Sequence, residues 1–437
     1  MEENSNWSSR AQGFLDAAYN AVRERVQPAE ERWFSKGYGE IEDYYTEVDS
    51  FMEKWAHDGL EGLKVPVHIT WRKMAANDHK RPHVWRDEGT FESPLAHKLP
   101  RQSQSCRCLF VRGAPGSGVY PPTRSIVVHM AATGTSTYTD REQELAMPLL
   151  LHGIASLIIM APFNGSRRPA GQTRHYIQNV ADYMLQSLAI ILEGAALLRT
   201  IEHGGLPPPR PGETYEQSLT SAVLGLSWGG AMAACAALVS QVPTACMVGL
   251  GSDSPRVMAT GALQWQLDWA ALAAGSHCTK EVAKSDLIEV FTRITFATVL
   301  ARAPRRDTLV SVVQVGARDD WYVDAAESRQ LFDSLRHAVA PLGWCRFEWI
   351  DGGHAAAFLR QRAIFVPACV EAVNAAQAHR AKQAVDTGHS VASEVAPVLS
   401  HAESGSWPLV RLLVGIALPV AVGAAVMVSQ QDIAALW

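Results

Sequence analysis

Three short motifs in this 437-residue chain carry the residue types that cleave an ester by nucleophilic attack. The strongest is Gly225-Leu226-Ser227-Trp228-Gly229-Gly230, which fits G-x-S-x-G and separates an apolar run typical of a strand from an Ala-rich run typical of a helix. A serine on such a sharp turn is strained, and its Oγ is exposed at the end of the strand. The turn also puts the N–H of Trp228 at a helix N-terminus, where developing negative charge is stabilised. We expect Ser227 to be a nucleophile; the alternative is a structural turn.

A nucleophilic serine needs a base and an acid that orients the base, and after G-x-S-x-G they follow in the order acid, then histidine. The preferred acid is Asp320, directly after a predicted strand and three residues before a valine that would begin the next helix. Asp319 is the near alternative, and Asp253, after the preceding strand, is the more distant one. Each of these aspartates could instead cap a helix.

The expected base is His354, in Asp351-Gly352-Gly353-His354 after the last predicted strand. The two glycines give this loop the freedom to turn the imidazole toward Ser227. One histidine among 15 carries little weight by itself, and a solvated loop residue is the alternative. The assignment of His354 as the base is supported by the three motifs together, because each follows a predicted strand and they occur in the expected order.

The second oxyanion donor is expected in the loop after an earlier strand, within His129–Thr135. The N–H of Thr133 or Ala132 is the candidate donor, with a plain turn as the alternative. His129 itself is expected to make a structural hydrogen bond. The seven cysteines contain no CxxC pair, so neither a zinc site nor a disulfide scaffold is predicted. The expected chemistry needs no metal and no organic cofactor.

Short apolar runs that alternate with helical patterns predict an α/β fold with a mostly parallel central sheet and helices on both faces. Long helices are expected over 180–201 and 230–239, and a last helix to about residue 378. The stretch 251–306 reads as helical without a strand, which predicts a helical cap over the site. Strands are expected at 106–111, 125–130, 156–160, 221–224, 246–250, 309–315 and 346–350.

The rest of the chain is divided by composition. Residues 1–62 are expected to form an N-terminal helical extension, 63–380 the catalytic domain and 381–408 a polar linker. Residues 409–437 contain an apolar run, Leu412–Val428, which is 17 residues long. It is interpreted as a transmembrane tail anchor, with a helix packed on the domain as the alternative. The acidic start, Met1–Asn4, predicts no secretory signal peptide.

Composition narrows the class of protein. With 39 Lys+Arg against 44 Asp+Glu, the net charge is −5, which gives no general basic field for nucleic acid. Hydrophobic residues make up 47% of the chain, enough for a packed core. Most cysteines lie in apolar runs, as expected of buried thiols in a reducing compartment. The pairs Arg167-Arg168 and Arg305-Arg306 are expected to be solvated or to meet a phosphate.

Several blocks resemble the α/β-hydrolase domain-containing protein 18 family. The resemblance runs from about Phe34 to Ala378, and its segment Pro162–Pro169 is more specific than the serine motif. Two features depart from the family pattern: the polar insertion of animal members between Gly251 and Leu309 is missing, and the C-terminal apolar run is extra. The matching blocks are Val65–Ile69, Gly89–His97, His129–Thr135, Pro162–Pro169, Leu192–Leu198, Gly225–Gly230 and Gly352–His354.

The resemblance implies an α/β-hydrolase fold, with Ser227, Asp320 and His354 at the positions of the family's serine, aspartate and histidine. It also implies a phospholipid substrate, with cardiolipin the named candidate, and a mitochondrial location. The leading hypothesis is a membrane-tethered serine hydrolase acting on a lipid acyl ester. The alternatives are an esterase, thioesterase or peptidase acting on a soluble substrate, and a non-catalytic membrane-bound scaffold.

Overall fold

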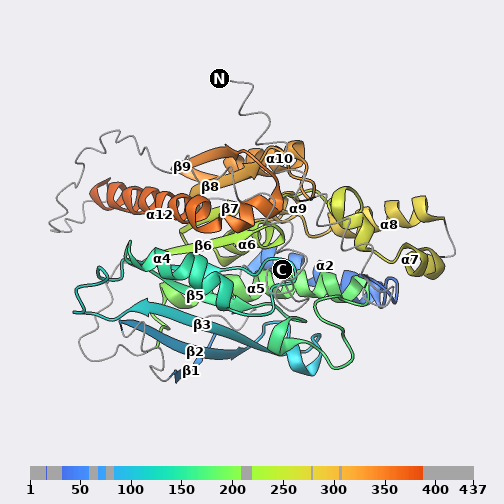
Figure 1. Cartoon of the computed structure of the whole chain (residues 1–437), viewed down its shortest axis with the longest axis horizontal. Coiled ribbons are helices and arrows are strands. Elements are labelled where there is room, and N and C mark those ends of the chain that lie inside the picture. The colour runs from blue at the N-terminus through green and yellow to red at the C-terminus, as the bar shows by residue number, and fades with distance from the viewer. Residues whose placement is uncertain are drawn as a thin grey trace, which may run out of the picture. The chain divides into compact units, whose positions relative to one another are not determined.

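The computed structural model of the chain describes residues 16, 32–58, 67–74, 83–207, 219–276, 279–304 and 308–386. A single sheet of nine strands runs through these residues in the order β1-β2-β3-β5-β4-β6-β7-β8-β9 (Figure 1). The neighbours β5, β4, β6, β7, β8 and β9 are parallel to one another. Strands β1, β2 and β3 extend the sheet on one side by antiparallel pairing. The mostly parallel α/β sheet predicted from the sequence is confirmed.

The predicted strands are all present. The strands are β1 (Thr70–Lys73), β2 (Val84–Glu92), β3 (Ser105–Gly113), β4 (Ser125–His129), β5 (Ile154–Met160), β6 (Thr220–Leu226), β7 (Thr244–Gly249), β8 (Leu309–Ala317) and β9 (Val339–Ile350). The longer helices are α2 (Ile41–Asp58), α5 (Val180–Glu202), α6 (Trp228–Ser240), α7 (Trp269–Ser276), α8 (Lys280–Thr292), α10 (Ala325–Ala338) and α12 (Gln361–Asp386). Short elements complete the set: α3 (Thr139–Arg141), the π-helical turn η3 (Glu142–Ala146), α4 (Met147–Leu150), α9 (Phe296–Ala301), α11 (His354–Leu359) and the 3₁₀ turns η2 (Arg101–Ser103), η4 (Gly165–Arg167) and η5 (Gly261–Gln266).

Alternation along each strand divides the core between the two faces of the sheet, because successive side chains of a strand point to opposite sides. Val128 and Val312 belong to the cluster that contains α2, α5 and α6. Their neighbours Val127 and Val313 belong to a second cluster, which α12 covers. Helices therefore cover both faces, as expected.

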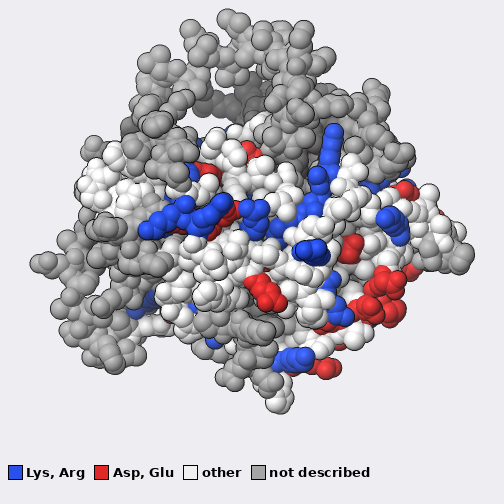
Figure 2. Space-filling model, turned by 90° about the horizontal axis from the view of Figure 1, so that it is seen from below, with Lys and Arg blue, Asp and Glu red and all other residues white. Residues whose placement is uncertain are grey.

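Strands β1 and β2 were not predicted, and their charges explain why. Glu88 of β2 is hydrogen-bonded to both Arg72 of β1 and Arg107 of β3. Asp87 is buried and pairs with the buried Arg112 at 2.5 Å. These paired charges replace the apolar alternation by which a strand is recognised. On the face seen in Figure 2, basic and acidic side chains of the described residues lie close to one another.

The described part of the N-terminal segment packs inside the fold. Five large side chains of α2 are buried in the main core: Tyr44, Val48, Phe51, Met52 and Trp55. Upstream of α2, the N–H of Trp33 donates to the carbonyl of Gln266 at 3.0 Å, and the N–H of Asp268 donates back to Trp33 at 2.9 Å. Residues 32–58 therefore join the sheet and the cap rather than forming a separate extension.

The predicted C-terminal boundary needs a correction. Helix α12 continues to Asp386, so residues 381–386 are helical and do not belong to the linker expected over 381–408. The sequence there, Ala381-Lys382-Gln383-Ala384, consists of good helix formers. The rest of the linker and the apolar segment 409–437 lie outside the described residues. Among the described residues, one helix, α5, has the length and apolar composition of a membrane span. Of its most apolar stretch of 18 residues, 89% is buried inside the molecule.

Candidate active site

Ser227 lies on a strained turn between β6 and α6, as the sequence predicts. Its backbone has φ 56° and ψ −128°, in a region that non-glycine residues rarely adopt. Its N–H donates to the carbonyl of Gly249 at the end of β7, at 2.7 Å, and its carbonyl accepts from the N–H of Gly230 at 2.8 Å. These two hydrogen bonds hold the turn against the sheet edge. Helix α6 begins at Trp228.

Two glycines allow this turn to form. A Cβ on Gly225 would overlap the carbonyl of Gly229, so the strand and the helix could not approach so closely. A Cβ on Gly229 would lie 2.6 Å from the carbonyl oxygen of Ala131. The second glycine therefore lets the serine turn pack directly on the loop after β4, which is the loop expected to supply an oxyanion donor.

Asp320 and His354 are joined directly. Oδ2 of Asp320 lies 2.7 Å from Nδ1 of His354, and the two side chains are 2% and 0% exposed. The other carboxylate oxygen accepts from the N–H groups of Tyr322 at 2.8 Å and Val323 at 2.9 Å. Because an ionised carboxylate only accepts hydrogen bonds, Nδ1 of the neutral imidazole carries the proton. Nε2 is then the basic nitrogen.

The pairing of β8 with β9 continues past the sheet and brings the two loops together. The N–H of Arg318 donates to Ile350 at 3.0 Å, and the N–H of Asp319 donates to Gly352 at 3.2 Å. The imidazole of His354 is further held between the rings of Tyr322 and Phe358, at centroid distances of 4.9 and 5.5 Å. Of the predicted acids, Asp320 is the one that meets His354.

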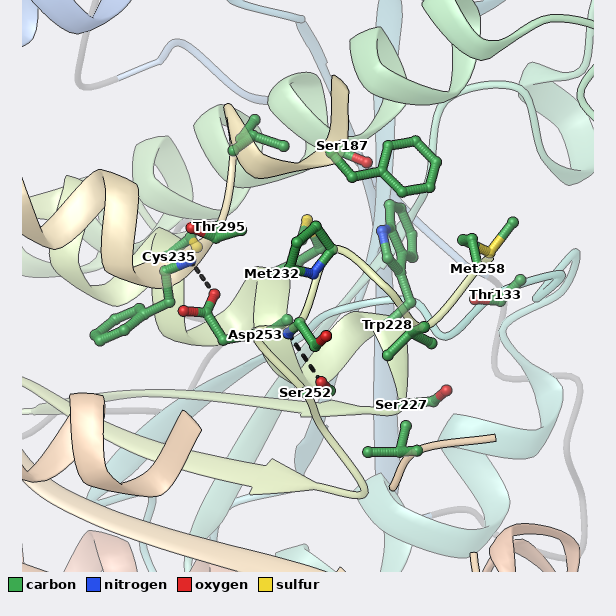
Figure 3. Close-up of a pocket in the computed structure, with 18 of the residues that line it drawn as sticks. Thr133, Ser187, Ser227, Trp228, Met232, Cys235, Ser252, Asp253, Met258 and Thr295 are labelled. Carbon is green, nitrogen blue, oxygen red and sulfur yellow. Dashed lines mark hydrogen bonds between the residues drawn. The ribbon is translucent and has the colours of Figure 1, made fainter. Parts of the chain in front are cut away.

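An apolar pocket opens beside Ser227 (Figure 3). It contains about 740 Å³ of space not filled by atoms, part of it open to solvent. Val323, whose N–H binds Asp320, is part of the wall, so the acid loop and the serine turn share this pocket. Its apolar walls come from α5, α6, the turns between β7 and α7, and the end of α8 with the start of α9: Met184, Trp228, Met232, Met258, Leu263, Phe291, Ile294 and Phe296.

The predicted cap forms much of this wall. Residues 252–258, Leu263 and 291–296 line the pocket, and no strand interrupts the described part of the stretch 251–306. Figure 3 shows Met258 and Thr133 on one side of Trp228 and Asp253 with Thr295 on the other. Neither Lys nor Arg is among the lining residues, so the pocket as described favours an uncharged, apolar group.

Asp253, the more distant predicted acid, has another role. Its oxygens accept from the N–H groups of Phe296 and Ala297, the latter at 2.8 Å, and so anchor the start of α9. Its side chain is buried, and burial raises the pKa of this carboxyl to about 6. It ties the cap to the end of β7 and makes no contact with His354 among the hydrogen bonds of the described residues.

The expected oxyanion loop lies at the pocket beside Ser227. Thr133 lines the pocket together with Ser227, and the Ala132 carbonyl accepts from Thr135 at 3.2 Å to close a turn. The buried guanidinium of Arg141 supports the strand end by donating to the carbonyl of His129 at 3.0 Å. His129 makes the structural contact expected of it, with Nε2 at 2.9 Å from Oγ of Ser156. The N–H groups of Trp228 and of Thr133 or Ala132 stay the predicted oxyanion donors.

One carboxylate at the site was not identified from the sequence. Asp16 is fully buried and accepts hydrogen bonds from the N–H groups of His354 and Ala355, each at 2.8 Å. It lies 338 residues before His354. The only signal was that Asp16 is the one charged residue in the apolar stretch from Gly13 to Val22.

Arg167 is neither solvated nor at a phosphate site, contrary to the expectation for the Arg167-Arg168 pair. Its guanidinium is fully buried and forms two hydrogen bonds to the carboxylate of Glu193 in α5, at 2.8 and 2.6 Å. It also donates to the carbonyls of Met160 and Ser103, each at 2.6 Å. This group holds the loop after β5 to the core.

Solved esterase structures match this chain at low similarity. Acetyl xylan esterase 1 from Thermoanaerobacterium sp. JW/SL YS485 is 12% identical, with 79% of this chain and 98% of that chain covered and a TM-score of 0.46. The acetyl xylan esterase from Paenibacillus sp. R4 is 13% identical, with 77% of this chain and 97% of that chain covered and a TM-score of 0.45. Esterase B from Lactobacillus rhamnosis is 13% identical, with 80% of this chain and 97% of that chain covered and a TM-score of 0.40. These values bear on neither substrate nor activity.

A family model matches more than half of the chain. The model is alpha/beta hydrolase domain containing 18, and it matches residues 31–301. This range includes the described part of the N-terminal segment from Arg32, the loop after β4, the serine turn and nearly all of the cap. Asp320 and His354 lie beyond this range, after β8 and β9, the next two strands of the same sheet. The chain has the α/β-hydrolase fold and belongs to the alpha/beta hydrolase domain containing 18 family.

Proposed function

We propose that this chain is a serine hydrolase that cleaves an acyl ester through Ser227, His354 and Asp320. The observation that carries the proposal is the buried Asp320–His354 hydrogen bond of 2.7 Å at the sheet edge where Ser227 occupies a strained turn. An aspartate on Nδ1 fixes the tautomer that leaves Nε2 basic and stabilises the imidazolium that forms in the reaction. A merely structural role for all three groups would not require the strain at Ser227.

The reaction follows from these roles. Nε2 of His354 takes the proton of Ser227 Oγ as the oxygen attacks the ester carbonyl carbon. The carbonyl becomes an oxyanion, stabilised by the N–H of Trp228 and an N–H of the Ala132–Thr133 turn, each worth about 3–4 kcal/mol in the transition state. His354 then gives the proton to the departing alcohol, which leaves an acyl-enzyme. Water, deprotonated by the same nitrogen, releases the acid and restores Ser227.

The substrate we propose is a lipid acyl ester, a phospholipid in particular. The pocket beside Ser227 is lined by methionine, phenylalanine, isoleucine and leucine side chains and by neither Lys nor Arg, which suits an acyl chain rather than a charged group. The family resemblance adds cardiolipin as a substrate and the mitochondrion as a location. We further propose that the apolar run Leu412–Val428 anchors the enzyme in a membrane, with the catalytic domain in a reducing compartment.

Labelling with a fluorophosphonate probe tests the catalytic part. The full chain should be labelled and the Ser227→Ala variant should not, while both keep the same far-ultraviolet circular dichroism. Ser221→Ala is a matched control, because Ser221 is a buried serine of β6, six residues before Ser227. An unlabelled, folded wild type, or equal labelling of the Ser227→Ala variant, would overturn the proposal and leave a non-catalytic scaffold as the explanation.

The lipid part has its own test. Full-length protein is incubated with phosphatidylcholine vesicles with and without 20 mol% cardiolipin (roughly a mitochondrial content), and released fatty acid is compared with hydrolysis of soluble p-nitrophenyl butyrate. Ile416→Arg with Val422→Arg should abolish flotation with vesicles, since each arginine at the centre of a span costs about 2.5–3.5 kcal/mol. A variant that floats normally contradicts the anchor. Hydrolysis of the soluble ester alone indicates a soluble substrate.

A further inference from the structure

A buried carboxylate from the beginning of the chain lies against the backbone of the proposed catalytic base. Asp16 is 0% exposed, and Oδ2 accepts from the N–H of His354 at 2.8 Å while Oδ1 accepts from the N–H of Ala355 at 2.8 Å. The N–H of Trp321, next to the acid Asp320, points at the same Oδ2 from 3.5 Å. A single carboxylate therefore contacts both the loop that carries the acid and the helix that carries the base.

The local sequence around His354 explains why this carboxylate is needed. Helix α11 begins at His354, and its N-cap residue is Gly353, which has no side chain to satisfy the first N–H groups of the helix. Such N–H groups need an acceptor when they are buried. Asp16 supplies both oxygens from outside the helix. A carboxylate at this position also interacts favourably with the helix dipole.

The neighbouring chain is shaped around the same carboxylate. A Cβ on Gly353 would collide with the Asp16 carboxylate, although the backbone of Gly353, with φ −100°, accepts any residue. Glycine is therefore required here by the carboxylate and not by the turn. Burial raises the pKa of Asp16 and the hydrogen bonds from Ala355 and His354 lower it, with smaller effects of the charges on Asp320 and His354.

We propose that Asp16 is a positioning residue of the active site, which holds the backbone of His354 in register with Asp320 and adds a second negative charge beside the imidazolium formed during the reaction. The proposal rests on the proposed function, because it assigns Asp16 to the same Ser227–His354–Asp320 reaction. Asp16 touches no reacting atom in this scheme; it acts through His354 and Trp321.

The test compares Asp16→Asn with wild type in the full-length protein. The amide replaces one accepting oxygen by an N–H donor that faces a backbone N–H, and it removes the charge. We expect kcat for p-nitrophenyl butyrate to fall by roughly 10- to 100-fold, as small misplacements of a catalytic group do, with KM within about twofold. The acid limb of the kcat/KM profile should move to lower pH, because a negative charge beside the imidazolium is lost.

Asp324→Asn is the matched control. Asp324 caps α10 by accepting from the N–H of Ala326 at 2.7 Å, at the same edge of the sheet but without a contact to the triad. Because asparagine caps a helix as well as aspartate does, this variant should keep the wild-type stability, kcat and pH profile. An Asp16→Asn enzyme with unchanged kcat and pH profile, or with a changed KM alone, overturns the proposal. Ser227→Ala in the same assay separates the two ideas: full activity there refutes the proposed function itself.

A second pair of variants keeps the test decisive if Asp16→Asn does not fold. Gly353→Ala should lower kcat, because its methyl group meets the Asp16 carboxylate. In an Asp16→Ala background the methyl group has room, so Gly353→Ala should add little further loss. Such non-additivity is expected of residues in contact. Strictly additive effects of Gly353→Ala and Asp16→Ala would show that the carboxylate does not act on this loop.

Discussion

Nδ1 of His354 lies 2.7 Å from Oδ2 of Asp320, although the two residues follow different strands, β9 and β8. The contact is made possible by the N–H groups of Arg318 and Asp319, which donate to carbonyls of the β9 loop beyond the last sheet pair. Both side chains are buried, so the hydrogen bond is shielded from water and strengthened. This is the relationship on which the proposed catalysis by Ser227 depends.

Asp320→Asn should reduce kcat by ~10⁴-fold, because an amide NH₂ toward Nδ1 favours the wrong imidazole tautomer. The measurement is kcat for p-nitrophenyl butyrate, together with the rate of fluorophosphonate labelling of Ser227. Asp319→Asn is the control, since the neighbouring aspartate does not bind Nδ1 of His354, and it should keep kcat within about threefold. A larger loss of kcat in Asp319→Asn than in Asp320→Asn would show that Asp319 is the acid.

Gly229→Ala should impair the oxyanion site more than the fold. The new Cβ would lie 2.6 Å from the carbonyl of Ala131, so the loop that ends in Ala132 and Thr133 has to move away from Ser227. Loss of one oxyanion donor lowers kcat by ~10²–10³-fold, whereas overpacking costs about 1–3 kcal/mol of unfolding free energy. Gly116→Ala controls for lost stability, because alanine is strained at its φ of 69° although no atom lies near the Cβ position. Unchanged kcat in Gly229→Ala would remove this loop from the mechanism.

Asp253 should make the free energy of unfolding depend on pH. Its pKa is about 6 in the folded protein and near 3.8 in the unfolded chain, so between these values the folded state binds more protons. The stabilising contribution is therefore fully present below about pH 4 and is lost as pH rises through 6, by about 3 kcal/mol in total. Urea unfolding from pH 4 to 7.5 should show this decline in wild type but not in Asp253→Asn. A difference between the two proteins that stays constant over this range contradicts the assignment.

Arg167→Met should strongly destabilise the fold by leaving Glu193 buried and unpaired. Removing one partner of a buried ion pair costs about 3–5 kcal/mol. The double variant Arg167→Met with Glu193→Leu should recover most of that loss, because no buried charge is left. Arg346→Met is the comparison: its pairs with Glu348 and Glu371 are half-exposed, and such pairs contribute about 0–1 kcal/mol. Urea denaturation of wild type and the three variants measures the free energy of unfolding. Equal losses of this free energy in Arg167→Met and Arg346→Met would contradict the prediction.

Sequence reasoning was sufficient where one local pattern determined the structure. The apolar runs of β4 to β8 are buried on both faces, so composition alone identified them, and the motif around Ser227 contains both the strand end and the helix start. Asp320 and His354 were predicted because each follows a predicted strand. Sequence favoured Asp320 over Asp319 because of the valine three residues later, but the contact that distinguishes them depends on how the β8 and β9 loops are held together.

The elements that were missed depend on contacts between distant parts of the chain. Strand β2 carries Arg86, Asp87 and Glu88, whose charges are compensated by partners on β1, β3 and η3. Glu142 of the π-helical turn, for instance, accepts from Arg86 at 2.5 Å. Asp16 could not be assigned because its partners are backbone N–H groups more than three hundred residues away. Buried charges of this kind are recognised only once their partners are in place.

The hydrogen bond between Asp16 and His354 spans a sequence separation of 338 residues and therefore has a consequence for biosynthesis. Asp16 is translated near the start and His354 near the end of the hydrolase domain, so no partly synthesised chain can close this contact. Contacts of such high sequence separation form slowly, because the entropy of loop closure must be overcome first. Ser227 and its turn are made earlier, yet they stay without an oriented base until the last strand has joined the sheet. The proposed triad therefore cannot form before His354 has been synthesised.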